Sequence, residues 1–319
     1  MTEVSRAADL LRAGELVAFP TETVYGLGAD AANPRAIARI FAAKGRPADH
    51  PLIVHLPDAA QLERWAVDVP EAAHRLAAAF WPGPLTLILK RHPSVSDAIT
   101  GGQDTVGLRV PNHPLALKLL RTFDGGVAAP SANRFGHVSP TTAAHVHVEL
   151  GDAVALVLDG GACAVGIEST ILDLSRGVPR ILRPGMLDAP MLAGILGRQP
   201  EFGGSRDVPR VSGSLDAHYA PSTPLRLVAA NDIPAAVRQA LAAGQRIVVL
   251  ATQAAPLADP GLAWHVASAD AAQFAHDLYA RLREFDVLGC DRILVAAPPD
   301  TEAWRAVNDR LMRAAAGAK

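Results

Sequence analysis

The chain is poor in cysteine and aromatic residues and carries almost no excess charge, and these shortages exclude several classes of protein. Its only cysteines among 319 residues are Cys163 and Cys290, too few for a disulfide framework, a CxxC redox pair or a four-cysteine zinc site. We expect two reduced thiols, buried or half-buried. Lys and Arg number 30 against 32 Asp and Glu, which gives a formal net charge of −2. No overall basic field is therefore present to hold nucleic acid or an anionic membrane.

Long hydrophobic runs are also missing. No uninterrupted apolar stretch reaches the ~18–20 residues that a membrane helix needs, and the first residues lack the basic start, apolar run and cleavage site of a signal peptide. We therefore expect a soluble, cytoplasmic protein without a membrane partner. Hydrophobic residues make up 50% of the chain, enough for packed cores, and its length makes two domains the default expectation.

Several common active-site motifs are missing too. The chain has no G-x-x-x-x-G-K-[ST] phosphate loop, no H-E-x-x-H, no G-x-S-x-G and no kinase motif. The stretch 26–31 matches the dinucleotide pattern G-x-G-x-x-A, but residues 20–25 separate it from the preceding strand and Pro34 starts the next helix too late, so we interpret it as a false match. His145 and His147 fall on different faces of a predicted helix, which favours surface histidines over a metal site.

Helix and strand patterns alternate over residues 1–198. Apolar runs predict strands at 16–19, 52–56, 85–90, 106–110, 126–129, 153–158, 169–174 and 180–182, and amphipathic patterns predict helices at 7–13, 34–44, 71–80, 115–120 and 139–150. Asn33-Pro34 and Ser139-Pro140 read as helix starts, while residues 20–32 read as a polar loop. This alternation predicts an α/β or α+β sheet domain.

The pattern changes near residue 198. Residues 199–224 are rich in Gly, Ser and Pro, show no periodicity and end in His218-Tyr219-Ala220-Pro221, so we predict a linker, and loops of this length are often functional. Residues 225–319 form the predicted C-terminal domain. Strands are predicted at 225–229, 247–251 and 293–297, and helices at 233–243, 271–285 and 301–315. The fully apolar strands predict a small parallel sheet that is covered on both faces.

Four polar clusters follow or join the apolar strands, where α/β proteins place their ligands. They are 20–26 (PTETVYG), 44–47 (KGRP) with His50 and His55, 128–136 (AAPSANRFG), and 166–170 (GIEST) together with 181–185 (ILRPG), and the stretches 81–86 and 107–111 complete the set. Lys44 and Arg46 combine a point charge with a fork of donors, which suits polyphosphate. The plainer alternatives are a capped turn at 20–26 and a solvated basic pair at 44–46. The composition supports an anion-binding pocket without a metal cage, and it does not name the substrate.

These motifs, in this order and spacing, resemble the YrdC-type threonylcarbamoyl-AMP synthases over roughly the first 200 residues. The matching segments are 19–28 (FPTETVYGLG), 44–47, 130–133 (PSAN) and 166–170. The remainder resembles the long form of that family, whose linker contains His-Tyr-Ala-Pro. The resemblance implies a twisted, open, mixed sheet with helices, joined by a long linker to a small Rossmann-like α/β domain.

The resemblance also implies a reaction. L-threonine, bicarbonate or CO2, and ATP with Mg²⁺ would give threonylcarbamoyl-AMP and pyrophosphate, and a separate transferase complex would use the product to form threonylcarbamoyladenosine (t6A) in tRNA. No metal ligand from the protein, and weak or no direct binding of nucleic acid, are expected.

Site residues follow from the same resemblance, position by position. Lys44, Arg46, Ser131 and Asn133 match the family's catalytic tetrad; Arg46, His50, Thr105, Ser131, Ser139, Arg183 and Tyr219 match ATP contacts; Thr23, His55, Arg109, Ala129 and Ser169 match L-threonine contacts. Arg109 would pair with the carboxylate, and Tyr219 would close over the site from the linker.

The chain departs from the family pattern at one place, and two other functions are possible. The family usually has Pro-Gly-Met and a basic residue before His-Tyr-Ala-Pro, whereas this chain has SGSLDA at 212–217. The alternatives are an RNA-binding module and a carbamoyl-adenylate-forming enzyme. The latter belongs to longer chains with zinc-finger and acylphosphatase-like parts, which are absent from this sequence.

Overall fold

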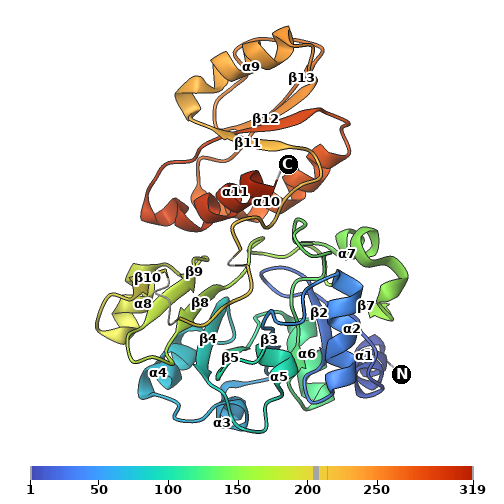
Figure 1. Cartoon of the computed structure of the whole chain (residues 1–319), viewed down its shortest axis with the longest axis vertical. Helices are drawn as coiled ribbons and strands as arrows, with labels where there is room; N and C mark the ends of the chain where they lie inside the picture. The colour runs from blue at the N-terminus through green and yellow to red at the C-terminus, as the bar shows by residue number, and fades with distance from the viewer. Residues whose placement is uncertain (1, 204–207, 214, 318–319) are drawn as a thin grey trace. The chain divides into compact units, whose positions relative to one another are not determined.

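The computed structural model of the chain describes residues 2–203, 208–213 and 215–317. Contacts divide it into two compact units, one of residues 1–135 and 139–214 and the other of residues 136–138 and 215–319 (Figure 1). Residues 204–207 and 214 of the predicted linker lie outside the described residues. Among the helices described, none combines the length and apolar character that crossing a membrane requires.

The first unit is built on an open, mixed sheet with the strand order β10-β9-β8-β4-β5-β3-β6-β2-β1-β7. The strands are β1 (Val17–Phe19), β2 (Gly26–Asp30), β3 (Ile53–His55), β4 (Leu85–Lys90), β5 (Thr105–Arg109), β6 (Val127–Ala128), β7 (Leu156–Val157), β8 (Thr170–Asp173), β9 (Arg180–Arg183) and β10 (Glu201–Phe202). Parallel and antiparallel pairs both occur, as in β3 with β5 and β4 with β5. The predicted fold class is confirmed.

Helices cover both faces of this sheet. They are α1 (Glu3–Arg12), α2 (Pro34–Lys44), α3 (Leu62–Trp65), α4 (Glu71–Phe80), α5 (Asp97–Thr100), α6 (Pro114–Phe123), α7 (Ala143–Leu150) and α8 (Ala189–Leu196), with short 3₁₀ turns at Ala59–Gln61 and Gly151–Ala153. Side chains alternate along a strand, so Val17 packs with α1 and α6 while Ala18 packs with α2 on the other face. The predicted start of α2 is confirmed, because Asn33 accepts hydrogen bonds from the amides of Arg35 and Ala36.

Strand β2 corrects the prediction of a loop at 20–32. Its sequence, GLGAD, has two glycines, which disfavour strands, yet all but Asp30 are buried. The tertiary structure needs a glycine here because a Cβ at Gly28 would lie 2.8 Å from the ring of Phe19 and 2.9 Å from Val127. Close packing between strands therefore outweighs the local preference.

The predicted helix start at Ser139-Pro140 is also wrong. Helix α7 begins at Ala143, and Thr142 is its cap, with the side chain accepting from the amide of His145. The carbonyl of Pro140 instead accepts a hydrogen bond from the amide of Tyr25 at 2.9 Å. This segment is thus tied to the loop after β1 rather than to a helix.

The second unit contains a four-stranded parallel sheet with the order β11-β14-β12-β13. Its elements are β11 (Leu225–Val228), α9 (Ile233–Ala242), β12 (Ile247–Ala251), β13 (Leu262–Val266), α10 (Ala271–Asp286), β14 (Arg292–Ala296) and α11 (Arg305–Gly317), with 3₁₀ turns at Ala230–Asp232 and Glu302–Trp304. Helix α9 covers one face, and α10 and α11 cover the other (Figure 1). The predicted parallel sheet is confirmed, and the half-buried edge strand β13 was missed.

Candidate active site

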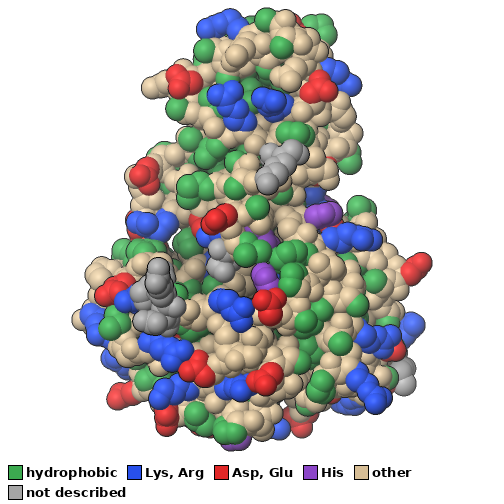
Figure 2. All heavy atoms as spheres, in the orientation of Figure 1, with side chains coloured by type: hydrophobic (Ala, Val, Ile, Leu, Met, Phe, Trp, Pro, Cys, Tyr) green, Lys and Arg blue, Asp and Glu red, His purple; other side chains and the backbone are tan. Residues whose placement is uncertain are grey.

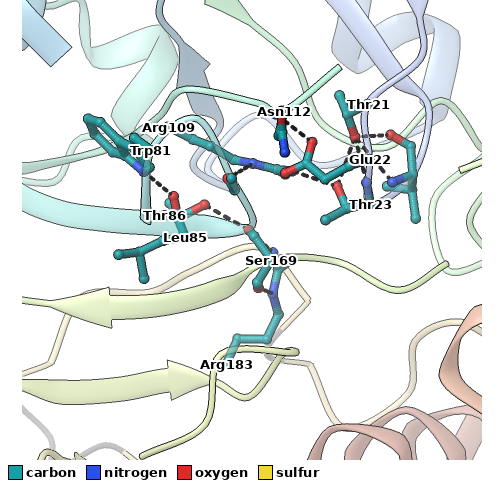
Figure 3. A network of polar contacts seen from close by, with 12 residues as sticks. Thr21, Glu22, Thr23, Trp81, Leu85, Thr86, Arg109, Asn112, Ser169 and Arg183 are labelled. Carbon is teal, nitrogen blue, oxygen red and sulfur yellow. Dashed lines mark hydrogen bonds and ion pairs between the residues drawn. The ribbon is translucent and has the colours of Figure 1, made fainter. Parts of the chain in front are cut away.

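A buried ion pair lies where β1 and β5 end. Glu22 follows β1, and its Oε1 atom lies 2.7 Å from Nη2 of Arg109, the last residue of β5 (Figure 3). The same Nη2 donates to Oγ1 of Thr23 at 2.8 Å, and Nε donates to the carbonyl of Gly83 at 3.2 Å. We call Glu22, Thr23 and Arg109 the Arg109 cluster. Burial of opposite charges is tolerated in a fold when they are paired and hydrogen-bonded in this way.

The loop that carries Glu22 is itself fixed by hydrogen bonds. The backbone amide of Asn112 donates to Oε2 of Glu22 at 2.8 Å. The hydroxyl of Thr21 donates to the carbonyl of Val24 at 2.6 Å and shares a hydrogen bond with the hydroxyl of Thr23 at 2.8 Å. We placed Glu22 in a polar cluster expected at a ligand site, but its ion pair with Arg109 was not predicted. A carboxylate between two threonines at a strand end, and an arginine at another, were the available signals.

His55 is the next neighbour of this cluster. It lies opposite Arg109 in the parallel ladder of β3 and β5, and its ring meets that of Phe19 edge-on at 5.9 Å between centroids. Burial lowers the pKa of His55 to about 3, and the positive charge of Arg109 contributes further. The imidazole is therefore neutral at pH 7.

A second cluster, formed by Thr86, Ser169 and Arg183, begins on β4, the strand next to β5. Nη2 of Arg183 donates to the Ser169 hydroxyl at 3.1 Å, and Nε donates to the Ser169 carbonyl at 3.1 Å. The hydroxyl of Thr86 lies 2.8 Å from that of Ser169 (Figure 3). We call this the Ser169 cluster. It joins Ser169 and Arg183, which the sequence analysis placed on two different substrates.

Lys44 organises a third cluster at the end of α2. Its Nζ atom donates to the backbone carbonyls of Ser131 and Asn133, and the carbonyl of Lys44 accepts from the amide of Phe135 at 2.8 Å. Burial lowers the pKa of Lys44 well below its usual value, and the nearby charge of Arg46 adds to this effect. The structure thus brings together Lys44, Ser131 and Asn133, with Lys44 shaping the loop that carries the other two.

Arg46 lies beside this loop. Its guanidinium donates from Nη2 to the carbonyl of Pro51 at 3.1 Å and lies 5.7 Å from the centroid of the Phe135 ring. The ring of His50 meets the same phenylalanine edge-on at 5.3 Å. Burial lowers the pKa of His50, with the charge of Arg46 as the second cause. Arg46 and His50 therefore belong to the same neighbourhood. We call Lys44, Arg46, Ser131 and Asn133 the Lys44 cluster.

Backbone pairing connects the three clusters. The loop 129–133 runs beside Tyr25 and Leu27, because the amide of Leu27 donates to Pro130 and the amide of Ala132 donates to Tyr25, both at 2.8 Å. Ala129 is anchored on β3, since its amide donates to the carbonyl of Ile53 at 2.9 Å. The hydroxyl of Ser139 donates at 2.6 Å to Glu168, the residue before Ser169.

Thr105 lies on β5 four residues before Arg109, on the same face of the strand and about 13 Å away along it. That face forms a shallow pocket, which Gly107 keeps open and which Pro51, Ile53, Thr105, Ile171 and Ser212 help to line. Nη1 of Arg183 donates to the carbonyl of Ser212 at 3.0 Å. Thr105 is thus on the side of Arg183.

Tyr219 belongs to the second unit and not to the unit that holds the other predicted residues. It adopts a left-handed backbone conformation with φ 60°. Its ring stacks on that of Tyr279 at 5.7 Å, and the guanidinium of Arg310 lies 5.2 Å from its centroid. A strained, well-packed tyrosine is typical of a functional position. Its role as a cover for the site stays a prediction.

Among the residues that the structure describes, no three His, Cys, Asp or Glu side chains converge on a possible metal site. The carboxylates near the clusters are otherwise engaged, Glu22 by Arg109 and Glu168 by Ser139. Neither of these two carboxylates is therefore available as a metal ligand in the fold described.

Comparison with known proteins covers nearly the whole chain. A family profile of the Sua5/YciO/YrdC type, described as telomere recombination, matches residues 9–185, and one described as the threonylcarbamoyl-AMP synthase C-terminal domain matches residues 186–316. The threonylcarbamoyl-AMP synthase of Bacillus subtilis is 41% identical over 99% of this chain and 93% of its own length; that of Pyrococcus abyssi is 39% identical over 97% and 92%. The crystal structure of P. abyssi Sua5 complexed with L-threonine superposes with a TM-score of 0.92, at 38% identity and covering 99% of this chain and 94% of that one.

Proposed function

Since the chain belongs to the threonylcarbamoyl-AMP synthases of the two-domain Sua5 form, we propose that the Arg109, Ser169 and Lys44 clusters together form the active site of its N-terminal unit. The enzyme makes threonylcarbamoyl-AMP for the t6A modification of tRNA, and L-threonine is its substrate. One observation carries the proposed location: a buried arginine on β5 and a buried arginine on β9 are linked through Ser169 and β4.

L-threonine binds at the Arg109 cluster in this proposal. Among the described residues, Nη1 of Arg109 has no hydrogen-bond partner, while Nε and Nη2 are held in place by Gly83, Glu22 and Thr23. A guanidinium fixed at two nitrogens and available at the third is suited to a carboxylate. Neutral His55 and small Ala129 shape the same end of the site without adding charge.

ATP binds on the side of Arg183 and Arg46. Both guanidiniums lie beside backbone carbonyls that border the pocket next to Thr105, namely those of Ser212 and Pro51. Ser131, Ser139 and His50 complete the expected contacts. Lys44 acts on this side by holding the loop of Ser131 and Asn133 against α2. Mg²⁺ enters as the complex with ATP, and we assign it no ligand from the protein.

The chemistry needs positioning and stabilisation of charge more than a protein nucleophile. The neutral amine of threonine adds to CO2 and loses a proton, which gives a carbamate. A carbamate oxygen then attacks the α-phosphorus of ATP, and the bond to pyrophosphate breaks. Negative charge grows on the departing pyrophosphate, and Arg46 and Arg183 offset that charge. Buried side chains keep water from the carbamate, which hydrolyses readily.

The linker, the fate of the product and the binding of nucleic acid complete the proposal. We propose that residues 199–224 link the YrdC-like domain (1–198) to the C-terminal domain (225–319), and that Tyr219 covers the bound substrates. The product would pass to a tRNA threonylcarbamoyl-transferase complex in the cytoplasm. Weak or absent binding of nucleic acid is expected, since Lys and Arg side chains are interspersed with Asp and Glu on the face shown in Figure 2.

The test is an assay of pyrophosphate release from ATP. We expect release that requires both L-threonine and bicarbonate, with L-serine as the control amino acid, and a product with the mass of threonylcarbamoyl-AMP. Release with carbamoyl phosphate in place of threonine and bicarbonate would favour a carbamoyl-adenylate-forming enzyme. Salt-dependent retention of tRNA without any turnover of ATP would favour an RNA-binding module.

A further inference from the structure

Thr86 lies between the two arginines of the site. In the antiparallel ladder of β4 and β5, Leu87 pairs with Leu108, so Thr86 and Arg109 are the next facing positions and share one face of the sheet. On its other side β4 pairs in parallel with β8, directly after Ser169. Thr86 is therefore the side chain of β4 that reaches from the Arg109 cluster to the Ser169 cluster.

Both hydroxyl groups are enclosed. Thr86 and Ser169 are each 0% exposed, and their oxygens lie 2.8 Å apart, facing each other (Figure 3). Among the described residues, the Thr86 hydroxyl has no second hydrogen-bond partner. The Ser169 hydroxyl has one, Nη2 of Arg183, which can only donate. Ser169 must therefore accept from Arg183.

Two arrangements of the protons remain. Either arrangement leaves one buried proton without an acceptor among the described residues: that of Thr86 if Ser169 donates, or that of Ser169 if Thr86 donates. Only the Ser169 proton can be accepted by the bound amino acid, because the resemblance places Ser169, and not Thr86, at L-threonine. If Thr86 donates to Ser169, the two lone pairs of Ser169 accept from Thr86 and from Arg183, and the Ser169 proton is free to be donated to another group. In that state Ser169 can donate a hydrogen bond but cannot accept one. Its remaining partner is then an acceptor, and an ammonium group is excluded.

We propose that Thr86 is a positioning residue, which holds Ser169 as a donor to the carboxylate of the bound amino acid. This inference rests on the proposed function, because the resemblance places Ser169 at L-threonine. The charge of Arg183 polarises the same hydroxyl and strengthens it as a donor. Arg109 and Ser169 then both donate hydrogen bonds to the same carboxylate. Through Ser169, Thr86 connects this carboxylate subsite to Arg183 on the ATP side.

The experiment compares L-threonine with L-threoninol, in which a hydroxymethyl group replaces the carboxylate. Binding to the full-length protein is measured by calorimetry for the wild type, Thr86→Val and Thr86→Ser. In Thr86→Val the Ser169 hydroxyl is no longer held as a donor, so it should lose its hydrogen bond to the charged carboxylate, and L-threonine should bind about tenfold more weakly. The affinity for L-threoninol should change less than about twofold in Thr86→Val. In Thr86→Ser the affinity for L-threonine should return to that of the wild type.

The matched control is Thr170→Val. Thr170 is also buried, follows Ser169 directly and makes a hydrogen bond to the carbonyl of Leu187 at 2.8 Å. Its loss should lower the melting temperature without changing the preference between the two ligands. Equal weakening of both ligands in Thr86→Val, or no rescue by serine, would overturn the positioning role. Absence of L-threonine binding in the wild type would instead refute the proposed function itself.

Discussion

Glu22 and Arg109 form an ion pair of 2.7 Å between side chains that are only 7% and 5% exposed. Both charges are almost completely shielded from bulk water, so each depends on the other and on the surrounding donors and acceptors. Thr23 and Gly83 complete the environment of the guanidinium, and Asn112 completes that of the carboxylate. The pair thus fixes the direction in which Arg109 presents its remaining nitrogen.

Glu22→Gln tests this dependence. The amide keeps the shape but leaves Arg109 as a buried charge without its counter-ion, so we expect a loss of about 3–5 kcal/mol in the free energy of unfolding. The KM for L-threonine should rise, because the guanidinium is no longer fixed. Urea unfolding and steady-state kinetics measure the two effects.

The matched control is Glu15→Gln, which removes an exposed pair with Arg39 and should cost about 0–1 kcal/mol. A Glu22 variant as stable as this control, with unchanged KM, would show that the buried pair does not organise the site.

Lys44 tests the proposed role of the loop at 131–133. Lys44→Met removes the donor shared by two backbone carbonyls, and we expect the rate of pyrophosphate release to fall about 100-fold through misplacement of the loop. Arg46→Ala should abolish pyrophosphate release, while the circular dichroism spectra of both variants stay those of the wild type. Lys118→Met, on the exposed side of α6, is the control. Wild-type turnover in either variant would remove that residue from the mechanism.

Arg183 tests the side assigned to ATP. Arg183→Lys keeps the charge but loses the fork that contacts Ser169 and Ser212, so we expect the KM for ATP to rise about tenfold. The comparison is Arg180→Lys on the same strand, whose arginine pairs with Glu201. If both variants show the same KM for ATP as the wild type, Arg183 does not contact the nucleotide.

His55 predicts a dependence of stability on pH. Its pKa is about 3 in the folded chain, compared with the ordinary histidine value of 6.5 in the unfolded chain. Between these two pH values the unfolded chain therefore binds a proton that the folded chain does not. Stability is complete above pH 6.5 and falls by up to about 1.4 kcal/mol per pH unit towards pH 3. Urea unfolding between pH 7.5 and 4.5 measures this slope.

In His55→Gln the titrating imidazole is removed, so the free energy of unfolding should fall less steeply with decreasing pH than in the wild type. Other titrating groups contribute equally to both proteins and cancel in the difference. Identical slopes would mean that His55 takes up its proton as readily in the folded chain as in the unfolded one.

Much of the fold and site could be predicted because the informative residues are local. Asn33-Pro34 marks the start of α2, and continuous apolar runs mark β4 and β12. The glycines of β2 pointed to a loop, since only the packed ring of Phe19 reveals why Gly28 lacks a side chain. A single sequence cannot show such a contact.

Contacts between side chains on different strands could not be predicted from the sequence either. Thr86 and Ser169 are 83 positions apart, and Glu22 and Arg109 are 87 apart, so their contact depends on the order of the strands. The sequence placed an anionic pocket near these turns. The strand order β8-β4-β5-β3 decides which donors and acceptors meet in it.

The most direct test of the account is a crystal structure of this protein with L-threonine and a non-hydrolysable ATP analogue. We expect the threonine carboxylate within about 3 Å of Arg109 Nη1 and of the Ser169 hydroxyl, with the triphosphate against Arg183 and Arg46. A carboxylate bound elsewhere, with Arg109 still engaged only by Glu22, Thr23 and Gly83, would contradict it.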